Sequence, residues 1–224
     1  MNMTMTDSET ESDIIQAKKK LRAQMKDMLS RMFSEENGST AAAARNAADY
    51  VFTLPAYKKA QNVLIFLSCG HEISTEYLIQ HITADGKRLA VPRIVPGTSD
   101  MSFFFLDSSR SIGSQTETGS YDITEPLASL ERIEVSCFPE KTLILVPGLA
   151  FTESGWRLGK GKGFYDRYLA GVISLNTGTH LPLALTAFCF SRQIVASLPH
   201  DADDIPLTHI ICEKGITVCD RLSL

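Results

Sequence analysis

Residues 141–151, KTLILVPGLAF, form the most strand-like stretch of the 224-residue chain. From Leu143 to Val146 the run is apolar at every position, without the alternation of a strand that has one wet face. After a short turn, the segment GWRLGKGKGFYDRY (155–168) supplies a glycine-rich loop and opens a predicted helix over residues 164–175. A strand buried on both faces that leads through a loop into a helix is typical of a parallel sheet covered on both sides.

The rest of the chain repeats this alternation of strands and helices. Further strands are predicted at residues 62–68, 87–95, 101–106, 181–190 and 208–215, and a helix at 75–83 with Ser74 or Thr75 as its cap. Two helices come first, at 13–33 and 40–54, and residues 107–125 have the composition of an extended loop. We therefore predict one α/β domain over residues 14–224 with an N-terminal helical pair. The acidic residues 1–13 are expected to be a disordered tail.

Composition restricts the classes of protein that fit the sequence. Hydrophobic residues make up 44% of the chain, enough for a substantial core, and the net charge of −4 argues against a general nucleic-acid surface. No apolar run approaches the roughly 20 residues of a membrane span. The N-terminal 13 residues contain four acids and no base, which opposes a secretory signal or a transit peptide. We therefore expect a cytoplasmic protein that does not bind a membrane and that is a monomer or a weak oligomer.

The five cysteines are odd in number and form no CxxC pair. Each lies in or beside an apolar stretch, so we expect reduced, mostly buried thiols rather than a disulfide framework or a zinc site. A catalytic cysteine is the less favoured alternative.

The glycine–lysine loop is the strongest candidate for a binding site. Glycine lets backbone amides approach an anion, and the start of the following helix adds N–H donors and partial positive charge. The spacing matches neither a P-loop nor a dinucleotide fingerprint. The alternative is a flexible basic turn. The predicted polyphosphate cradle contains Arg157, Gly159, Lys160, Gly161, Lys162 and Gly163.

Acidic residues lie at three places near the ends of predicted elements: after a strand, before a strand, and at the start of the helix at 164–175. Asp166, in the first turn of the helix, either complements the helix dipole or binds Mg²⁺ beside phosphates. The loop with Asp201, Asp203 and Asp204 is either a solvated acidic loop or a cation site. Glu72 follows the strand at 62–68, so it either binds a polar ligand group or caps the next helix.

With the glycine loop and these acidic residues, the sequence resembles the 5-formyltetrahydrofolate cyclo-ligase family, whose members are also called methenyltetrahydrofolate synthetases. The segment VPGLAFTESGWRLGKGKGFYDRYL (146–169) is similar to that family's long signature. The resemblance runs from about Lys18 to Ile211 and also includes KKKLRAQM (18–25), IFLSCGHEISTEYLI (65–79), YDITEP (121–126) and LPHDADDIPL (198–207).

The resemblance implies a three-layer sandwich with a mostly parallel sheet and an ATP-dependent reaction. In that reaction the formyl oxygen of 5-formyltetrahydrofolate attacks the γ-phosphate of Mg·ATP, giving an iminium phosphate. Ring closure by the 10-nitrogen then releases phosphate and yields 5,10-methenyltetrahydrofolate. Phosphorylation turns a poor leaving group into a good one, so the protein must mainly position substrates and stabilise phosphate charge. The resemblance implies a folate substrate with or without a polyglutamate tail.

Carried over to this chain, the resemblance implies a role for each matching residue. It implies catalytic roles for Arg157, Lys160 and Lys162, folate contacts for Glu72, Phe164 and Tyr165, and Mg²⁺ ligands in Asp166 and Asp204. The implied ATP contacts are Lys18, Arg22, Arg157, Gly159, Lys160, Gly161, Lys162, Gly163 and Tyr165.

Three positions depart from the family pattern: Thr152 stands where Asp is common, Lys160 where Arg is usual, and Phe164 where Tyr is frequent. They bear on substrate affinity more than on reaction type. Two alternatives stay open at this point. One is another enzyme on a related sheet, such as a sugar-phosphate isomerase or an acyl-CoA transferase. The other is a non-catalytic module that binds RNA.

Overall fold

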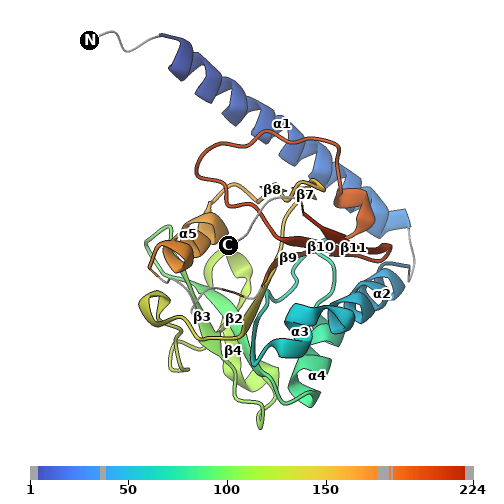
Figure 1. Ribbon diagram of the computed structural model, residues 1–224, viewed down its shortest axis with the longest axis vertical. Helices are drawn as coiled ribbons and strands as arrows, with labels where there is room; N and C mark the ends of the chain where they lie inside the picture. Colours follow the sequence, from blue (N-terminus) through green and yellow to red (C-terminus); the bar gives the residue numbers. More distant parts are fainter. Residues whose placement is uncertain (1–4, 36–38, 176–181, 183, 220–224) are drawn as a thin grey trace.

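The computed structural model describes residues 5–35, 39–175, 182 and 184–219. Its centre is a seven-stranded sheet in the order β11-β10-β9-β6-β1-β2-β3 (Figure 1). The five inner strands are parallel, and the edge strands β3 and β11 are antiparallel to their neighbours. The strands are β1 (Asn62–Leu64), β2 (Arg88–Ile94), β3 (Met101–Phe105), β6 (Thr142–Val146), β9 (Ala184–Phe188), β10 (His209–Cys212) and β11 (Gly215–Val218).

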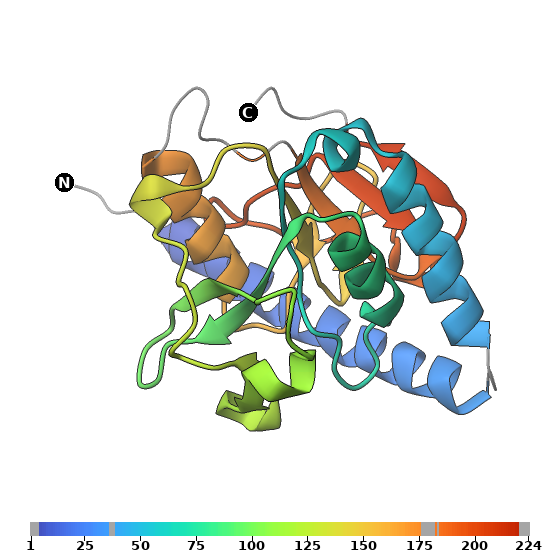
Figure 2. The ribbon, with the colours of Figure 1, turned by 90° about the horizontal axis from the view of Figure 1, so that it is seen from below.

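Two hydrophobic cores, one on each face of the sheet, make the fold a three-layer sandwich. Alternate residues of one strand enter different cores: Leu143 and Leu145 pack on one face, and Ile144 and Val146 on the other. The first face is covered by α1 (Met5–Glu35), α2 (Ser39–Thr53), α3 (Pro55–Lys59) and α4 (Glu76–Ala84), and the second by α5 (Phe164–Leu175) (Figure 2). The predicted fold class, a mostly parallel α/β sandwich with an N-terminal helical pair, is confirmed.

Helix α1 packs through one stripe of apolar side chains. Met25, Leu29 and Met32 are buried at helical spacing, and the helix lies along one end of the sheet (Figure 1). It begins at Met5, so residues 5–13 are helical where the sequence predicted a disordered tail.

Several predicted elements differ from those observed. Residues 107–125, predicted as an extended loop, contain the short helices η1 (Ile112–Gln115) and η2 (Ser120–Asp122) and the hairpin of β4 (Thr116–Thr118) and β5 (Thr124–Pro126). The strand predicted at 141–151 divides into β6 and β7 (Ala150–Phe151), and β7 pairs with β8 (Arg157–Leu158). The strand predicted at 62–68 ends at Leu64. Of the strand predicted at 181–190, residues 181 and 183 lie outside the described residues.

The cap predicted for the helix at 75–83 also differs. Thr75 occupies the N-cap position of α4 but makes no capping hydrogen bond with its side chain. Its hydroxyl instead accepts from the backbone N–H of Ser68, and the Ser74 hydroxyl accepts from the N–H of Glu76. Thr75 therefore ties α4 to the segment that follows β1.

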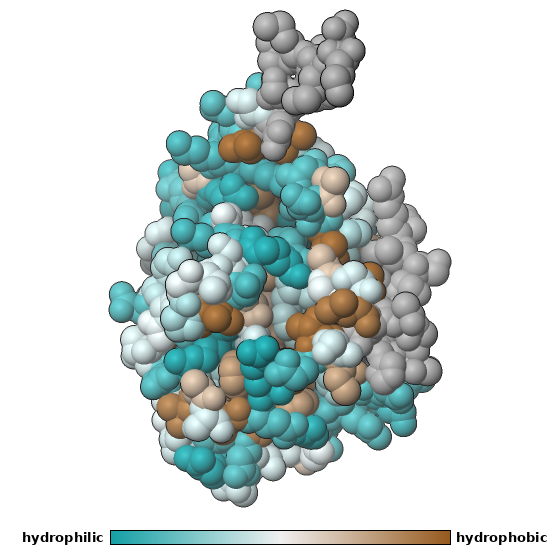
Figure 3. Space-filling view, turned by 90° about the vertical axis from the view of Figure 1, so that its left-hand side faces the viewer, coloured by the Kyte–Doolittle hydropathy of each residue, from teal (hydrophilic) through white to brown (hydrophobic). Residues whose placement is uncertain are grey.

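On the face shown in Figure 3, hydrophobic residues form small patches separated by hydrophilic ones. Within the described residues, no helix combines the length and apolar character needed to cross a membrane. Cys69, Cys137, Cys189 and Cys212 carry free thiols, as predicted. The expectation of burial holds for Cys189 and Cys212, whereas Cys69 is half-buried and Cys137 is exposed.

Candidate active site

A cleft of about 960 Å³ opens at the carboxyl ends of the parallel strands. The chain runs from β1 to β2 on one side and returns through β6 to β9 on the other, so the strand order reverses between β1 and β6. Ligands of open α/β sheets bind at such a reversal. The cleft is lined by Phe66 and Glu72 after β1 and by Pro147 and Gly148 after β6. It is also lined by every residue for which the sequence predicted a role in the site: Lys18, Arg22, Glu72, Arg157, Gly159, Lys160, Gly161, Lys162, Gly163, Phe164, Tyr165, Asp166 and Asp204.

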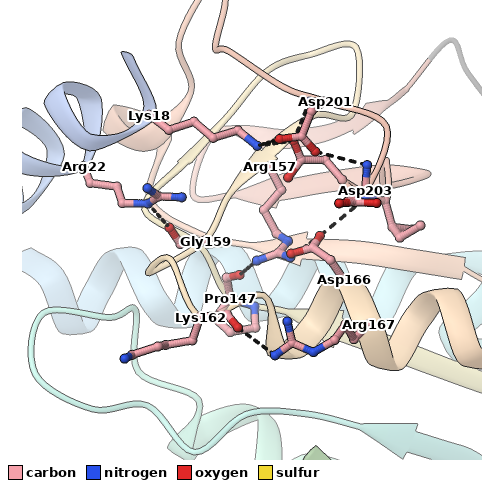
Figure 4. A network of polar contacts seen from close by, with 12 residues as sticks. Lys18, Arg22, Pro147, Arg157, Gly159, Lys162, Asp166, Arg167, Asp201 and Asp203 are labelled. Carbon is pink, nitrogen blue, oxygen red and sulfur yellow. Dashed lines mark hydrogen bonds and ion pairs between the residues drawn. The ribbon is translucent and has the colours of Figure 1, made fainter. Parts of the chain in front are cut away.

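The glycine–lysine loop leads directly into the N-terminus of α5. Gly161 and Gly163 have positive φ values of 100° and 66°, which side chains with a Cβ rarely adopt. The loop is held from two sides (Figure 4). Arg22 of α1 donates to the Gly159 carbonyl at 3.0 Å, and Arg167 of α5 donates to the Lys162 carbonyl at 2.7 Å. The sequence predicted an ATP contact for Arg22, and the structure shows it fixing the predicted cradle.

Lys18 of α1 bridges two carboxylates of the 201–204 loop. Its ammonium lies 2.6 Å from both Asp201 Oδ2 and Asp204 Oδ2, and the residue is only 8% exposed (Figure 4). Burial disfavours the charged amine, but the two aspartates outweigh this and raise the pKa of Lys18. Hydrogen bonding to Lys18 lowers the pKa of Asp201. The acidic loop is therefore an ion-paired wall of the cleft rather than a freely solvated turn.

Arg157 and Asp166 form a second ion pair deeper in the cleft. The guanidinium Nη2 lies 2.7 Å from Asp166 Oδ1, and Arg157 is 5% exposed. The same Asp166 oxygen accepts from the Ile205 N–H at 3.4 Å, which links the start of α5 to the acidic loop. Among the described residues, Arg157 Nε is buried without a hydrogen-bond partner. A donor of this kind is available to a ligand oxygen.

Glu72 is a further acid of the cleft, and it pairs with the glycine loop. Glu72 Oε1 lies 2.7 Å from Lys160 Nζ, and Oε2 accepts from the backbone N–H of Cys69 at 3.0 Å. The Cys69 thiol lies 3.5 Å from Oε2 and 3.4 Å from Lys160 Nζ. These contacts draw the carboxylate toward the cleft and leave the capping of α4 to other groups. Burial and the charge of Glu72 raise the pKa of the Cys69 thiol, so it stays protonated at neutral pH.

Two aromatic residues open α5 beside the loop. The Tyr165 hydroxyl is buried and has no hydrogen-bond partner among the described residues, and the Arg157 guanidinium lies 5.6 Å from its ring centre. Burial, followed by the negative charge of Glu72, raises the pKa of Tyr165, so its O–H is a donor at neutral pH. Phe164 is partly buried, and the guanidinium carbon of Arg167 lies 5.9 Å from the centre of the Phe164 ring. The cleft therefore offers two unsatisfied buried donors, Arg157 Nε and Tyr165 O–H.

The sequence predicted Asp166 and Asp204 as ligands of a magnesium ion that also binds phosphate. In the described part of the chain, no three His, Cys, Asp or Glu side chains gather as a metal-binding group. Mg²⁺ is commonly held by only one or two carboxylates, with waters and phosphates filling its other positions. Asp166 uses Oδ1 and Asp204 uses Oδ2 in the contacts above, and no contact within the described residues reaches the other oxygen of either carboxylate.

Some residues of the cleft carried no predicted role. Asp201 shares Lys18 with Asp204, and Cys69 contacts both Glu72 and Lys160. Tyr121 is 62% exposed at positive φ (59°), and Lys162 Nζ lies 5.4 Å from its ring centre. The rule that selected Glu72, position directly after a strand, applies equally to Cys69. Tyr121 begins the segment YDITEP of the resemblance, but its strained backbone is visible only in the structure.

The cleft combines a glycine loop at a helix N-terminus with a switch point between parallel strands and with paired acids and bases. This combination is typical of α/β proteins that bind phosphate groups. Comparison with known proteins makes this class specific. The model of the 5-formyltetrahydrofolate cyclo-ligase family matches residues 14–213, and the chain belongs to that family.

Named relatives agree with this assignment. The chain is 31% identical to the 5-formyltetrahydrofolate cyclo-ligase of Mus musculus, over 89% of this chain and 95% of the relative. It is 30% identical to that of Escherichia coli K12, over 77% and 88%. The NMR structure of Aquifex aeolicus 5,10-methenyltetrahydrofolate synthetase has a TM-score of 0.71 at 26% identity, and the match covers 93% of this chain and 96% of that one.

Proposed function

We propose that this protein is an ATP-dependent 5-formyltetrahydrofolate cyclo-ligase. It converts 5-formyltetrahydrofolate to 5,10-methenyltetrahydrofolate and releases ADP and phosphate. The observation that carries the proposal is the cleft itself, in which the family's signature segment, residues 146–169, meets the acids that follow β1 and precede β10. The alternatives of an RNA-binding module or another sheet enzyme are not favoured, since the matched relatives are named as cyclo-ligases.

The phosphates of ATP bind at the glycine loop. The backbone N–H groups of the loop and of the first turn of α5 are donors for an anion, and the cations around them add full charges. The lysines of the loop, Lys160 and Lys162, lie at its accessible edge, and the buried Arg157 lies behind it. Charge spreads over the γ-phosphoryl oxygens as the formyl oxygen attacks, and these donors stabilise it.

Asp166 and Asp204 hold Mg²⁺ together with the nucleotide phosphates. When bound there, the ion neutralises phosphate charge that the side chains alone leave uncompensated. Lys18 and Arg157 occupy one oxygen of each carboxylate and fix its orientation. The two cations thus act as positioning residues for the acids in addition to contacting phosphate.

The folate binds on the Glu72 side of the cleft. The carboxylate accepts hydrogen bonds from the amino and N–H groups of the pterin ring, and Phe164 and Tyr165 border the substrate. Neither the attack on ATP nor the ring closure requires a nucleophilic side chain, since the formyl oxygen and the 10-nitrogen are both supplied by the folate. A protonated Cys69 is consistent with this chemistry.

The test is a spectroscopic assay with the purified full chain, MgCl₂, ATP and 5-formyltetrahydrofolate. The near-ultraviolet absorbance of the methenyl product should rise only when both substrates are present. Absence of the product with both substrates present would refute the proposal. Tight binding of RNA without any ADP release would favour the binding-module alternative.

A further inference from the structure

The ion pair between Lys160 and Glu72 joins the two parts of the cleft to which different substrates are assigned. Lys160 belongs to the glycine loop, Glu72 to the segment after β1, and their charged atoms lie 2.7 Å apart. The two partners are not equally held. Glu72 is fixed from the sheet side by the Cys69 N–H, and its side chain is 13% exposed, whereas that of Lys160 is 47% exposed. Lys160 is therefore the partner that can move.

The neighbouring lysine of the same loop provides a direct contrast. Lys162 lies two residues further along and contacts the Tyr121 ring, with no ion pair to a carboxylate within the described residues. Its ammonium is available to phosphate without breaking an ion pair. Only one of the two lysines is thus tied to the folate side of the cleft.

We propose that the Lys160–Glu72 pair couples the binding of the two substrates: folate takes over Glu72 and thereby releases Lys160 to the phosphates of ATP. This inference rests on the proposed function, because it assigns the two ends of the pair to the two substrates.

The physical reason is the cost of leaving Glu72 unpaired. If ATP binds first and draws Lys160 away, a largely buried carboxylate loses its main partner, which is unfavourable. If folate binds first, the N–H donors of its pterin ring satisfy Glu72, and Lys160 moves without that cost. Each substrate then binds more tightly in the presence of the other, and thermodynamic linkage requires the same factor in both directions.

The size of the effect follows from the exposure of the pair. A half-exposed lysine is screened by water, which weakens its ion pair. The strongest exposed ion pairs and the weakest measured couplings between two binding sites both change an affinity by about fivefold. We therefore expect the dissociation constant of the nucleotide to fall about fivefold when folate is bound.

Calorimetric titration of the full chain with Mg²⁺ and β,γ-imido-ATP, which is not cleaved, tests this coupling with and without saturating 5-formyltetrahydrofolate. In the wild type, the nucleotide should bind about fivefold more tightly with folate present, and folate should show the same ratio. Lys160→Met should reduce both ratios to one. It should also bind folate alone at least as tightly as the wild type, because no ammonium competes for Glu72. Loss of a merely structural contact would weaken folate binding instead.

Two further variants make the result specific. Lys162→Met should weaken nucleotide binding equally with and without folate, so that the ratio stays near fivefold. Glu72→Gln should abolish the coupling from the other end of the pair. The inference is overturned if Lys160→Met retains the wild-type ratio, or if the wild type shows no coupling while it forms methenyl product. Failure to form product at all would overturn the proposed function and the coupling with it.

Discussion

The sheet has a hollow at each end, and only one of them has the character of an active site. The hollow at the amino end of β2 has a volume of about 620 Å³ and contains Arg88, Glu131, Arg110 and Asp107. Its ion pair, Arg88–Glu131, is short at 2.7 Å but exposed at 51% and 64%. Its buried amide, Gln115, is satisfied by the backbone around it. Within the described part of the chain, this charged hollow has no buried side-chain donor without a hydrogen-bond partner.

The cleft at the carboxyl end differs in how its charges are held. Arg157 and Lys18 are buried. Arg157 pairs with Asp166, nine residues further along the chain, whereas the aspartates that pair with Lys18 lie more than 180 positions away. Arg157 Nε and Tyr165 O–H are left without partners among the described residues. Charge alone is therefore a poor indicator of a site, whereas buried and incompletely satisfied charge at a strand switch point is a strong one.

Arginine substitutions at the two ends of the sheet should give the largest difference in kcat/KM. Arg157→Ala should lower kcat/KM by about 100-fold or more, because charge stabilisation of the transferring phosphoryl group is lost. It also leaves Asp166 without its ion pair, so the melting temperature should fall. Arg88→Ala, its matched control, should stay within about twofold of wild type, since exposed ion pairs contribute little. Equal activity of the two variants would remove Arg157 from the mechanism.

Aspartate substitutions should separate the two ends by their dependence on magnesium. Asp166→Asn should raise the Mg²⁺ concentration for half-maximal turnover by about 10-fold, because a neutral amide is a poorer ligand for Mg²⁺. The fold should persist, since Asn is tolerated near a helix start. Asp107→Asn in the amino-end hollow should leave the requirement unchanged. If the requirement of Asp166→Asn is also unchanged, Asp166 acts only through the helix dipole and Arg157.

Glutamate substitutions should separate the two ends by substrate. Glu72→Gln should raise the KM for 5-formyltetrahydrofolate by about 10-fold, since a hydrogen bond to a charged partner contributes about 1.5–3 kcal/mol. The melting temperature should stay near wild type, because the Lys160 partner is half-exposed. ATP alone should bind up to about fivefold more tightly, since the carboxylate no longer holds Lys160. Glu131→Gln should change neither KM. A lower melting temperature with an unchanged folate KM would give Glu72 a structural role.

Thiol labelling should give the smallest effect and needs no substitution in the site. Cys69 should react with iodoacetamide more slowly than the exposed Cys137, and its rate should rise with pH beyond the usual thiol range, because burial and Glu72 raise its pKa. Saturating 5-formyltetrahydrofolate should slow labelling of Cys69 and leave Cys137 unchanged. Peptide mass spectrometry measures both rates in one sample. Labelling of Cys69 that folate does not slow would place the substrate elsewhere.

The layers of the fold were readable from the sequence because fully apolar runs such as residues 143–146 have few alternatives to a buried strand. The edge strand β11 was missed. It is short and partly exposed, and it depends on pairing with β10 rather than on a pattern of its own.

The sequence was enough to predict which residues gather in the cleft, but not which charged side chains form ion pairs with each other. Position after a strand was enough to predict that Glu72 and the glycine loop lie at one edge of the sheet. Asp204, in the acidic loop before β10, was assigned to the site by the resemblance. The pairing of Lys18 with Asp204 spans 186 positions, and no local pattern encodes it. It depends on how α1 lies across the end of the sheet, which is set by packing of the whole domain.

The central claim is that the carboxyl-end cleft joins cleavage of ATP to closure of the folate ring. It is tested most directly by measuring ADP and methenyl product in the same reaction, using purified wild-type protein with Mg²⁺, ATP and 5-formyltetrahydrofolate. The account predicts equal amounts of the two at every time point and neither when one substrate is omitted. ADP released without methenyl product, or methenyl product formed without ATP, would contradict it.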